Sequence, residues 1–267
     1  MPQYDTFVFN HIPKCGGTSF RALLNESALK SNVPVEEIFI PGFNGLEEDK
    51  NIDQLSIREK AVLRRKKKRI FACHSRFDVA KTYKLPFGNI FYFTILRDPV
   101  KRFLSHYNFF YYKHGYMDCK GILLNDLTED KLAFLLEDLS NIHCKYLAAY
   151  RARDIYIVRW ENVFRVAKYN LQYEYASFGI LEEMDEMIPG INKMLPEWLT
   201  LERALPSSNT QKYKKSQQEI KPEILERIQE HNRLDIELYN FAKDYFKFKM
   251  TIIDDEQNFR KTYNYKF

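Results

Sequence analysis

The sequence predicts an α/β fold in which a central, mostly parallel sheet is flanked by helices. Short apolar runs such as FVF, IFYFTIL and IYIV have the near-continuous hydrophobic character of strands that are buried on both faces. Longer amphipathic segments separate these runs, and such alternation of β and α elements is typical of parallel sheets. With 267 residues, of which 45% are hydrophobic, the chain is long enough to bury a sizeable core.

The expected elements follow from the spacing of the apolar residues. The strands are predicted at Asp5–Asn10, Arg69–His74, Asn89–Leu96, Ile155–Arg159 and Tyr175–Gly179. The helices are predicted at Thr18–Lys30, Ile52–Lys67, Pro99–Tyr112, Glu129–Leu139, Cys144–Tyr150, Val163–Asn170, Glu182–Met194 and Glu223–Lys247. We expect one domain over residues 1–250, followed by a C-terminal tail over residues 251–267.

The composition excludes several classes of protein. With only 9 Gly and 10 Pro, the chain is neither collagen-like nor of low complexity. No apolar run approaches the roughly 18 residues that span a bilayer. The N-terminus MPQYDTFVFNHIPK lacks the basic and apolar regions of a signal peptide. These features predict a globular protein without a membrane span.

The cysteines do not predict a metal site. Cys15, Cys73, Cys119 and Cys144 contain no C-x-x-C pair, which argues against zinc. Four cysteines in a chain of this size are typical of reduced thiols rather than of a disulfide scaffold. A bridge between Cys119 and Cys144 stays open at this stage.

Six adjacent basic residues, Arg64–Arg69, dominate a net charge of only +5. Such a block is either the solvated end of a helix or a contact for an anionic partner. The net charge alone does not indicate a nucleic-acid-binding protein.

Polar residues follow three of the predicted strands. They are His11–Ser19, Cys73–Ser75 and Arg97–Pro99. In parallel α/β sheets, ligands bind where the carboxyl ends of the strands meet the N-termini of helices. The sequence therefore predicts a binding site at this edge of the sheet.

The segment His11–Ser19 has the composition of an anion-binding loop. Gly16 and Gly17 let backbone N–H groups approach an anion, and the following helix N-terminus favours negative charge. Thr18 and Ser19 add hydroxyls and Lys14 adds a cation. The alternative is an ordinary turn capped by a hydroxyl. Because Lys14 precedes the glycines, the loop does not match the Walker A pattern of nucleotide kinases.

The motifs together resemble a known family. HIPKCGGTSF resembles the 5′-phosphosulfate loop of the sulfotransferases that use 3′-phosphoadenosine 5′-phosphosulfate (PAPS), within them the carbohydrate branch that contains the heparan 2-O-sulfotransferases. FTILRDPVKRFLSHYNF resembles the 3′-phosphate segment of that branch, FACHSRFD its histidine-bearing strand end, and AKYNLQYEYASFGILEEMDEMI its late helix–strand–helix. The resemblance covers residues 5–247. It implies a P-loop-like three-layer fold and in-line sulfuryl transfer from PAPS to a carbohydrate hydroxyl, without a metal.

The resemblance also implies residue roles. The 5′-phosphosulfate would be held by Lys14, Cys15, Gly16, Gly17, Thr18 and Ser19, with Cys15 standing where the family more often has Thr. Arg97 and Ser105 would hold the 3′-phosphate, and His74 would be the general base. Lys14 would also stabilise the leaving oxygen. In Ser207–Ser216, which matches a region that covers the cofactor, Thr210, Lys212 and Lys214 would either contact phosphate or belong to a linker.

The residues themselves support these roles and leave alternatives open. Arg97 ends an apolar run, and Asp98-Pro99 is a good helix start, which places Ser105 two turns along that helix. The alternative is a surface pair of Arg97 with Asp98.

The histidines differ in their candidacy. His74 suits a general base because the pKa of histidine lies near working pH, whereas the alternative is a core histidine that caps a strand. His11 is a candidate for orienting the loop, and His106 and His143 are weaker candidates. His114 and His231 are predicted at the surface.

The expected partner is a glycan or another hydroxyl-bearing acceptor, and an anionic one if the block Arg64–Arg69 contacts it. No nucleic-acid partner is expected. Lack of an apolar anchor predicts a cytoplasmic enzyme, with a trimmed lumenal domain of a Golgi enzyme as the alternative. Two rival functions are a P-loop kinase acting on a small molecule and a non-catalytic module that binds polyanions.

Overall fold

The computed structural model describes residues 4–33, 35–36, 57, 68–77, 89–149, 159–202 and 220–263. Its centre is a sheet of parallel strands in the order β2-β3-β1-β4-β5. The strands are β1 (Thr6–Asn10), β2 (Val35–Glu36), β3 (Arg69–Cys73), β4 (Ile90–Leu96) and β5 (Ser177–Ile180). The predicted α/β fold with a central parallel sheet flanked by helices is therefore confirmed.

The helices account for most of the other described residues. They are α1 (Gly17–Lys30), α4 (Pro99–His106), α5 (Glu129–Asp138), α6 (Ile142–Leu147), α8 (Trp160–Tyr169), α9 (Met184–Met194), α10 (Pro222–His231) and α11 (Arg233–Tyr263). Two π-helical segments, Tyr107–Lys113 and Asn170–Glu174, continue α4 and α8. Short 3₁₀ turns lie at Tyr116–Asp118, Leu124–Asp126 and Leu181–Glu183.

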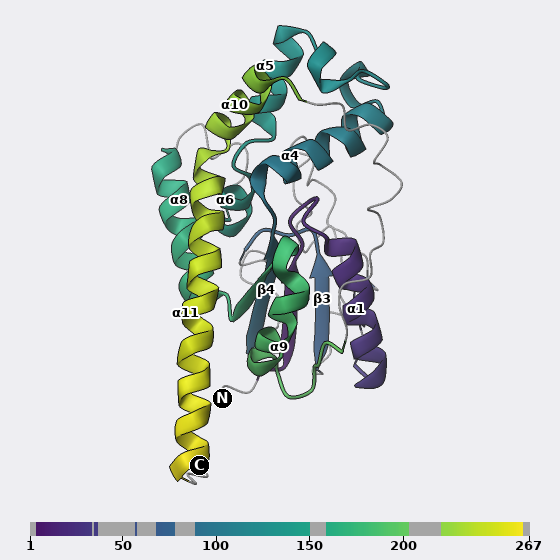
Figure 1. Ribbon diagram of the computed structural model, residues 1–267. Coiled ribbons are helices and arrows are strands. Elements are labelled where there is room, and N and C mark those ends of the chain that lie inside the picture. Colours follow the sequence, from purple (N-terminus) through teal and green to yellow (C-terminus); the bar gives the residue numbers. More distant parts are fainter. Residues whose placement is uncertain are drawn as a thin grey trace.

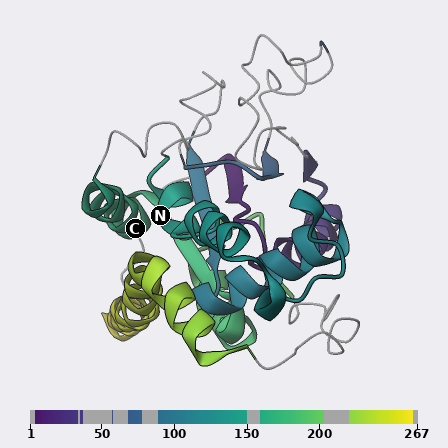
Figure 2. The same cartoon turned by 90° about the horizontal axis from the view of Figure 1, so that it is seen from above.

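The helices divide into those beside the sheet and those above it. Helix α1 packs along β2 and β3, whereas α9 and α11 contact β5, and α11 also contacts α6 and α8 (Figure 1). Seen from above, the sheet lies between α1 on one side and α10 and α11 on the other (Figure 2). Helix α4 crosses the end toward which the strands point, with α10 and α5 beyond it (Figure 1).

Two hydrophobic clusters follow this division. The larger cluster surrounds the sheet and includes Phe7, Phe9, Phe20 and Phe93, all fully buried. The smaller one joins α4, α5 and α10 through residues such as Phe103, Tyr107, Leu136 and Ile228. Burial of a large apolar side chain contributes about 1.5–3 kcal/mol, so both clusters are substantial stabilising units. Helix α4 therefore stands between the two cores, directly over the sheet edge.

Some predicted elements differ from the observed ones. The predicted helix Glu223–Lys247 is broken at Asn232, whose φ of −103° and ψ of 17° interrupt the helical backbone between α10 and α11. Helix α11 then continues to Tyr263, so the proposed boundary after residue 250 lies within a helix. The predicted helix Ile52–Lys67 lies outside the described residues except for Ile57, as does the predicted strand Ile155–Arg159 except for Arg159. Strand β2 was not predicted.

Candidate functional site

The strand register brings the three polar strand ends together. Asn10, the last residue of β1, pairs with Cys73 of β3 on one side and with Thr94 of β4 on the other. The chain leaves each of these strands at the same edge of the sheet, as parallel strands require. His11 and His74 therefore follow two neighbouring strands at the same level. The register thus brings the polar residues that follow these strands to one edge of the sheet.

The loop after β1, residues His11–Ser19 and hereafter the donor loop, ends in an uncapped helix N-terminus. Gly16 is the N-cap of α1, with a left-handed φ of 77°, and no side chain caps the helix. The helix supplies no acceptors for the N–H groups of its first turn, Gly17, Thr18 and Ser19. Thr18 is exposed and Ser19 is half-buried. The turn is therefore not capped by a hydroxyl, and its amides point to an anion-binding function.

Both glycines of the donor loop are required by close contacts. A Cβ atom on Gly17 would lie 1.9 Å from the ring of His11, and one on Gly16 would lie 2.4 Å from Cδ1 of Leu181. The left-handed backbone at Gly16 also favours glycine. The loop consequently packs tightly on His11 while its amides stay at the strand edge.

Lys14 also has a left-handed backbone, with φ of 66°, and its side chain rests on an aromatic ring. Its Nζ atom lies 3.9 Å from the ring centroid of Phe109, in the π-helical segment after α4. Burial, with the nearby cations Arg97 and Lys113, lowers the pKa of Lys14 to about 8. An anion bound beside Lys14 would favour its charged form, because opposite charges stabilise each other.

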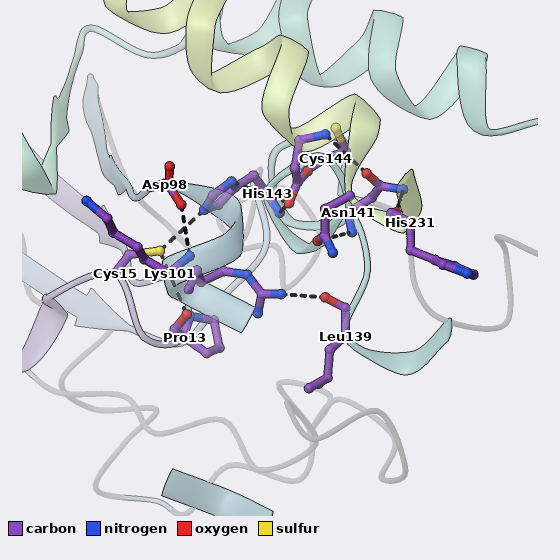
Figure 3. A network of polar contacts seen from close by, with 12 residues as sticks. Pro13, Cys15, Asp98, Lys101, Leu139, Asn141, His143, Cys144 and His231 are labelled. Atoms are coloured by element: carbon purple, nitrogen blue, oxygen red, sulfur yellow. Dashed lines mark hydrogen bonds and ion pairs between the residues drawn. The ribbon is translucent and has the colours of Figure 1, made fainter. Parts of the chain in front are cut away.

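Arg97 connects the end of β4 to the donor loop. Its Nη1 donates to the carbonyl oxygen of Lys14 at 2.9 Å, and its Nε lies 4.0 Å from Oε1 of Glu182. Asp98 instead caps α4, because its Oδ1 accepts the N–H of Lys101 at 2.8 Å (Figure 3). The alternative of a simple Arg97–Asp98 surface pair is therefore not what the structure shows. Ser105 lies half-buried in the last turns of α4.

His74 and His11 form a stacked pair at the centre of the edge. Their ring centroids are 3.8 Å apart, and Nδ1 of His74 lies 3.0 Å from the carbonyl oxygen of His11. A carbonyl can only accept, so Nδ1 carries the proton and Nε2 has the lone pair. Burial lowers the pKa of His74 to about 4, against the smaller raising effect of that hydrogen bond. Burial and the His74 ring also hold the pKa of His11 well below its usual value.

Two buried side chains that the sequence reasoning missed hold this edge in place. Asn10 donates from Nδ2 to Oγ of Ser75 at 2.7 Å, and its Oδ1 accepts the hydroxyl of Tyr175 at 3.1 Å. Thr94 donates to the carbonyl oxygen of Asn10 at 2.9 Å. The sequence signal that could have indicated Asn10 is its place as a polar residue at the end of an apolar strand. These bonds fix the segment after β3, which carries His74.

Cys15 differs from the other residues of the donor loop. Its side chain is buried, and its backbone N–H donates to the carbonyl oxygen of Ile12 at 3.3 Å. Its Sγ lies 3.4 Å from Nε2 of His143 (Figure 3). The N–H and the thiol of Cys15 are thus both directed to partners within the protein.

The remaining candidates are placed as follows. His143 is fully buried and His106 is half-buried, whereas His114 and His231 are exposed, as predicted. Cys15, Cys119 and Cys144 are free thiols, so Cys119 and Cys144 are not bridged. Thr210, Lys212, Lys214 and residues 64–67 of the basic block lie outside the described residues. Arg69 is buried in β3.

The described residues include neither a metal-binding cluster nor a membrane-spanning helix. In that part of the chain, no cluster of three or more His, Cys, Asp or Glu side chains is arranged to hold a metal ion. The helices described there include none that combines the length and the apolar character needed to cross a membrane.

Comparison with known proteins gives one similar protein and one family. The chain is 26% identical over 191 residues to heparan-sulfate 6-O-sulfotransferase 2 from Danio rerio. The aligned region covers 60% of this chain and 39% of that protein, so the match spans well under half of the relative's length. The model of the sulfotransferase family matches residues 1–242. The match includes the donor loop, His74 and Arg97, and the chain belongs to the sulfotransferase family.

Proposed function

We propose that the protein transfers a sulfuryl group from PAPS to a hydroxyl of a carbohydrate acceptor. Family membership supports sulfuryl transfer, and the name of the Danio rerio relative supports a glycan as acceptor. The observation that carries the proposal is that His74 and the donor loop lie at the same edge of the sheet. A half-buried, neutral imidazole with an assigned tautomer stands at the same strand edge as a row of helix N-terminal amides and Lys14.

The chain's residues fit a donor with two anionic ends. The first-turn amides of α1 and the Lys14 ammonium suit a phosphosulfate, because both supply positive potential at close range. Arg97 lies where β4 ends, and a guanidinium is well suited to a second phosphate. When bound, PAPS would supply the activated sulfuryl group. Gly16 and Gly17 keep bulk away from the amides that would face it.

Each residue then has a task that its geometry suits. His74 accepts the proton of the acceptor hydroxyl at Nε2, because its Nδ1 is already protonated and directed at His11. Lys14 and the donor-loop amides stabilise the negative charge that grows on the leaving 5′-phosphate. Arg97 keeps the Lys14 carbonyl in place while its cation faces the second phosphate. Thr18 and Ser19 offer hydroxyls beside the same anion.

Replacement of the base tests the proposal. We expect His74→Ala to lower kcat by about 10²–10⁴-fold, the usual contribution of a general base. Binding of 3′-phosphoadenosine 5′-phosphate should stay near the wild-type level, because His74 would face the acceptor. His114→Ala, at an exposed histidine, is the matched control. Transfer of labelled sulfate from PAPS across a panel of glycans and phenols measures both variants. An active His74→Ala enzyme would rule out this base.

Ligand-induced stabilisation distinguishes the proposal from its rivals. A nucleotide that binds only the folded state raises the melting temperature, by an amount that grows with the logarithm of its concentration over its Kd. We expect 3′-phosphoadenosine 5′-phosphate to do so, and ATP with magnesium to have little effect. The opposite pattern would indicate a kinase. Stabilisation by heparin alone would indicate a module that binds polyanions.

A further inference from the structure

A buried chain of three side chains links the donor loop to helix α11 and takes no part in the proposed transfer. Sγ of Cys15 lies 3.4 Å from Nε2 of His143, and Nδ1 of His143 lies 3.3 Å from Oδ2 of Asp235. Cys15 is 1% exposed, and the other two side chains are fully buried. Figure 3 shows Cys15 of the loop facing His143 of α6. The three residues come from distant parts of the sequence.

The protonation states of Cys15 and His143 determine which atoms donate and which accept in this row of three side chains. Burial raises the pKa of the Cys15 thiol to about 12, so the thiol keeps its proton. Burial lowers the pKa of His143 to about 4, which outweighs the raising effect of Asp235 and leaves the ring neutral. The thiol lies within reach of two acceptors, Nε2 of His143 at 3.4 Å and the carbonyl oxygen of Pro13 at 3.8 Å, and the shorter contact assigns its proton to Nε2. The ring proton is then on Nδ1, which lies 3.3 Å from Oδ2 of Asp235 but is not aligned for a hydrogen bond to it. A neutral thiol and a neutral imidazole thus lie beside one buried carboxylate, which holds the backbone N–H of His143.

Asp235 is itself fixed by backbone contacts. Its two carboxylate oxygens accept the N–H groups of His143 and Cys144, each at 2.8 Å, at the N-terminus of α6. Its own N–H donates to Oδ1 of Asn141 at 3.1 Å. A carboxylate at a helix N-terminus is also favoured by the helix dipole. Asp235 is consequently held rigidly, and His143 has little freedom to move away from Cys15.

Cys15, at the other end of this row of three side chains, lies where the donor loop needs support. Lys14 and Gly16, on either side of Cys15, both have left-handed backbones, with φ of 66° and 77°. Such a backbone is unfavourable for a lysine and persists only where surrounding contacts determine it. Arg97 fixes the carbonyl of Lys14 from one side. The Cys15 thiol is the side-chain contact that fixes the loop from the side of the protein interior.

We propose that Cys15, His143 and Asp235 are positioning residues that hold the donor loop in its anion-binding conformation. The proposal rests on the proposed function only in naming the anion, the 5′ end of the donor nucleotide. The Cys15 hydrogen bond keeps Lys14 over Phe109 and the first-turn amides of α1 at the strand edge. Loss of the thiol leaves Nε2 of His143 buried without its donor and frees the loop to sample other conformations.

Variants of Cys15 separate positioning from packing. Cys15→Ala removes the donor, Cys15→Ser keeps a donor in a smaller side chain, and Cys119→Ala removes a buried thiol from the other hydrophobic cluster as a control. We expect Cys15→Ala to weaken binding of 3′-phosphoadenosine 5′-phosphate about five- to tenfold, the worth of one buried hydrogen bond. Cys15→Ser and Cys119→Ala should bind within about twofold of wild type, because neither removes the donated bond.

The kinetic constants provide a second criterion. A loop that is held less well should raise KM for PAPS and leave kcat at saturation nearly unchanged, because binding then restores the conformation. Wild-type affinity in Cys15→Ala would overturn the inference and leave the proposed function intact. Failure of the wild-type protein itself to bind the nucleotide would overturn the proposed function and this inference with it. Binding to the wild type therefore distinguishes the two failures.

A measurement on the wild-type protein does not depend on any variant folding. In ¹⁵N-labelled protein, the ring nitrogens of His143 should show a neutral imidazole protonated at Nδ1 and accepting at Nε2. The signals of the His143 ring nitrogens are assigned because they are absent from the spectrum of the His143→Gln variant. A proton on Nε2 would overturn the proposal, because the Cys15 thiol would then donate to the carbonyl oxygen of Pro13, within its own loop, and sulfur is only a weak acceptor for Nε2. In Cys15→Ser the shift of Nε2 should stay close to that of the wild type.

Discussion

His11 supports the candidate base with two of its groups. Its ring stacks on His74, and its carbonyl oxygen determines which nitrogen of His74 carries the proton. The ring in turn occupies the space that a side chain on Gly17 would need. His11, Gly17 and His74 therefore pack together as one unit. Its consequence is that the base and the donor loop share one set of contacts.

The proposed function gives Arg97 two tasks, support of the Lys14 carbonyl and binding of the 3′-phosphate, and a nucleotide series separates them. Arg97→Ala should weaken binding of 3′-phosphoadenosine 5′-phosphate about ten- to a hundredfold, because a charge-assisted hydrogen bond to the 3′-phosphate is lost. Adenosine 5′-phosphosulfate, which lacks that phosphate, should lose less, through the loosened Lys14 carbonyl alone. Titration calorimetry measures both, with Arg227→Ala, which removes a guanidinium paired with Glu129 instead, as the control. If both nucleotides lost affinity equally, Arg97 would only support the loop and would not bind the 3′-phosphate.

Phe109 is expected to tune the position of Lys14. Removing the ring in Phe109→Leu abolishes a cation–π contact worth about 0.5–2 kcal/mol. We expect KM for PAPS to rise about two- to tenfold, because Lys14 then adopts several rotamers in the free enzyme. Phe134→Leu, at a partly exposed aromatic residue of α5, serves as the control. Unchanged KM in Phe109→Leu would show that the donor itself orders Lys14.

Single residues were predictable where local sequence determines them. Lys14, Gly16 and His74 stand beside apolar strands in a short motif, and their positions at the edge follow from the strand register. The contact of Cys15 with His143 joins residues 128 positions apart, and no spacing in the sequence indicates it. His143 was accordingly only a weak candidate. Asp235 and Phe109 were missed because their significance arises from packing between elements.

Helices α6 and α11 cap each other at their N-termini. Asn141 precedes α6 and accepts the N–H of Asp235 in α11, whereas Asp235 accepts two N–H groups of α6. Asn232, between α10 and α11, accepts the N–H of Asn141 at 3.2 Å, and Nδ2 of Asn141 donates to the carbonyl oxygen of His231 at 2.9 Å. Two helix ends that would otherwise be costly to bury are thereby satisfied.

Substitutions at Asn141 should reveal this mutual capping. Asn141→Ala loses both side-chain bonds and places alanine at a φ of 47°, so we expect a loss of about 2–3 kcal/mol in the free energy of unfolding. Asn141→Gly loses the same bonds without the backbone strain and should be about 1 kcal/mol more stable than the alanine variant. Urea unfolding measures both. Wild-type stability in Asn141→Ala would show that the caps contribute nothing.

Elements were predictable to the extent that their apolar pattern is continuous. The three strands that carry the site's edge, β1, β3 and β4, have uninterrupted or nearly uninterrupted apolar runs and lie within one residue of the prediction. The break at Asn232 was missed because the apolar spacing continues through it. Its cause is a contact with Asn141, 91 residues away. Helix α4 likewise ends at His106 because the backbone widens into a π-helical segment that periodicity does not reveal.

Neutral histidines that are buried or half-buried make the stability of the whole molecule sensitive to acid. Burial lowers the pKa of His74 and His143 to about 4, and it holds the pKa of His11 and of His106 well below the usual value. In the unfolded chain these groups protonate near pH 6.5. Between these limits the unfolded state binds more protons than the folded state, so stability decreases as pH falls.

We expect the free energy of unfolding to decline from about pH 6.5 toward pH 4, with up to about 1.4 kcal/mol per pH unit from each such histidine. Urea midpoints across this range measure the slope, and His143→Gln should make it shallower. His114→Gln, at an exposed position, should leave it as in the wild type. A midpoint that does not change between pH 6.5 and pH 4 would contradict the assignment of neutral buried rings.

The central place of β1 in the sheet determines when the site can assemble. Thr6 pairs with Arg69 on one side and with Ile90 on the other, so the first strand made must wait for partners synthesised much later. Contacts between residues so distant in sequence carry a loop-closure cost and slow the folding of the chain. The donor loop follows β1 directly, yet its supporting edge exists only once β3 and β4 have docked. During synthesis on the ribosome, the segment that comes first is thus among the last to become functional.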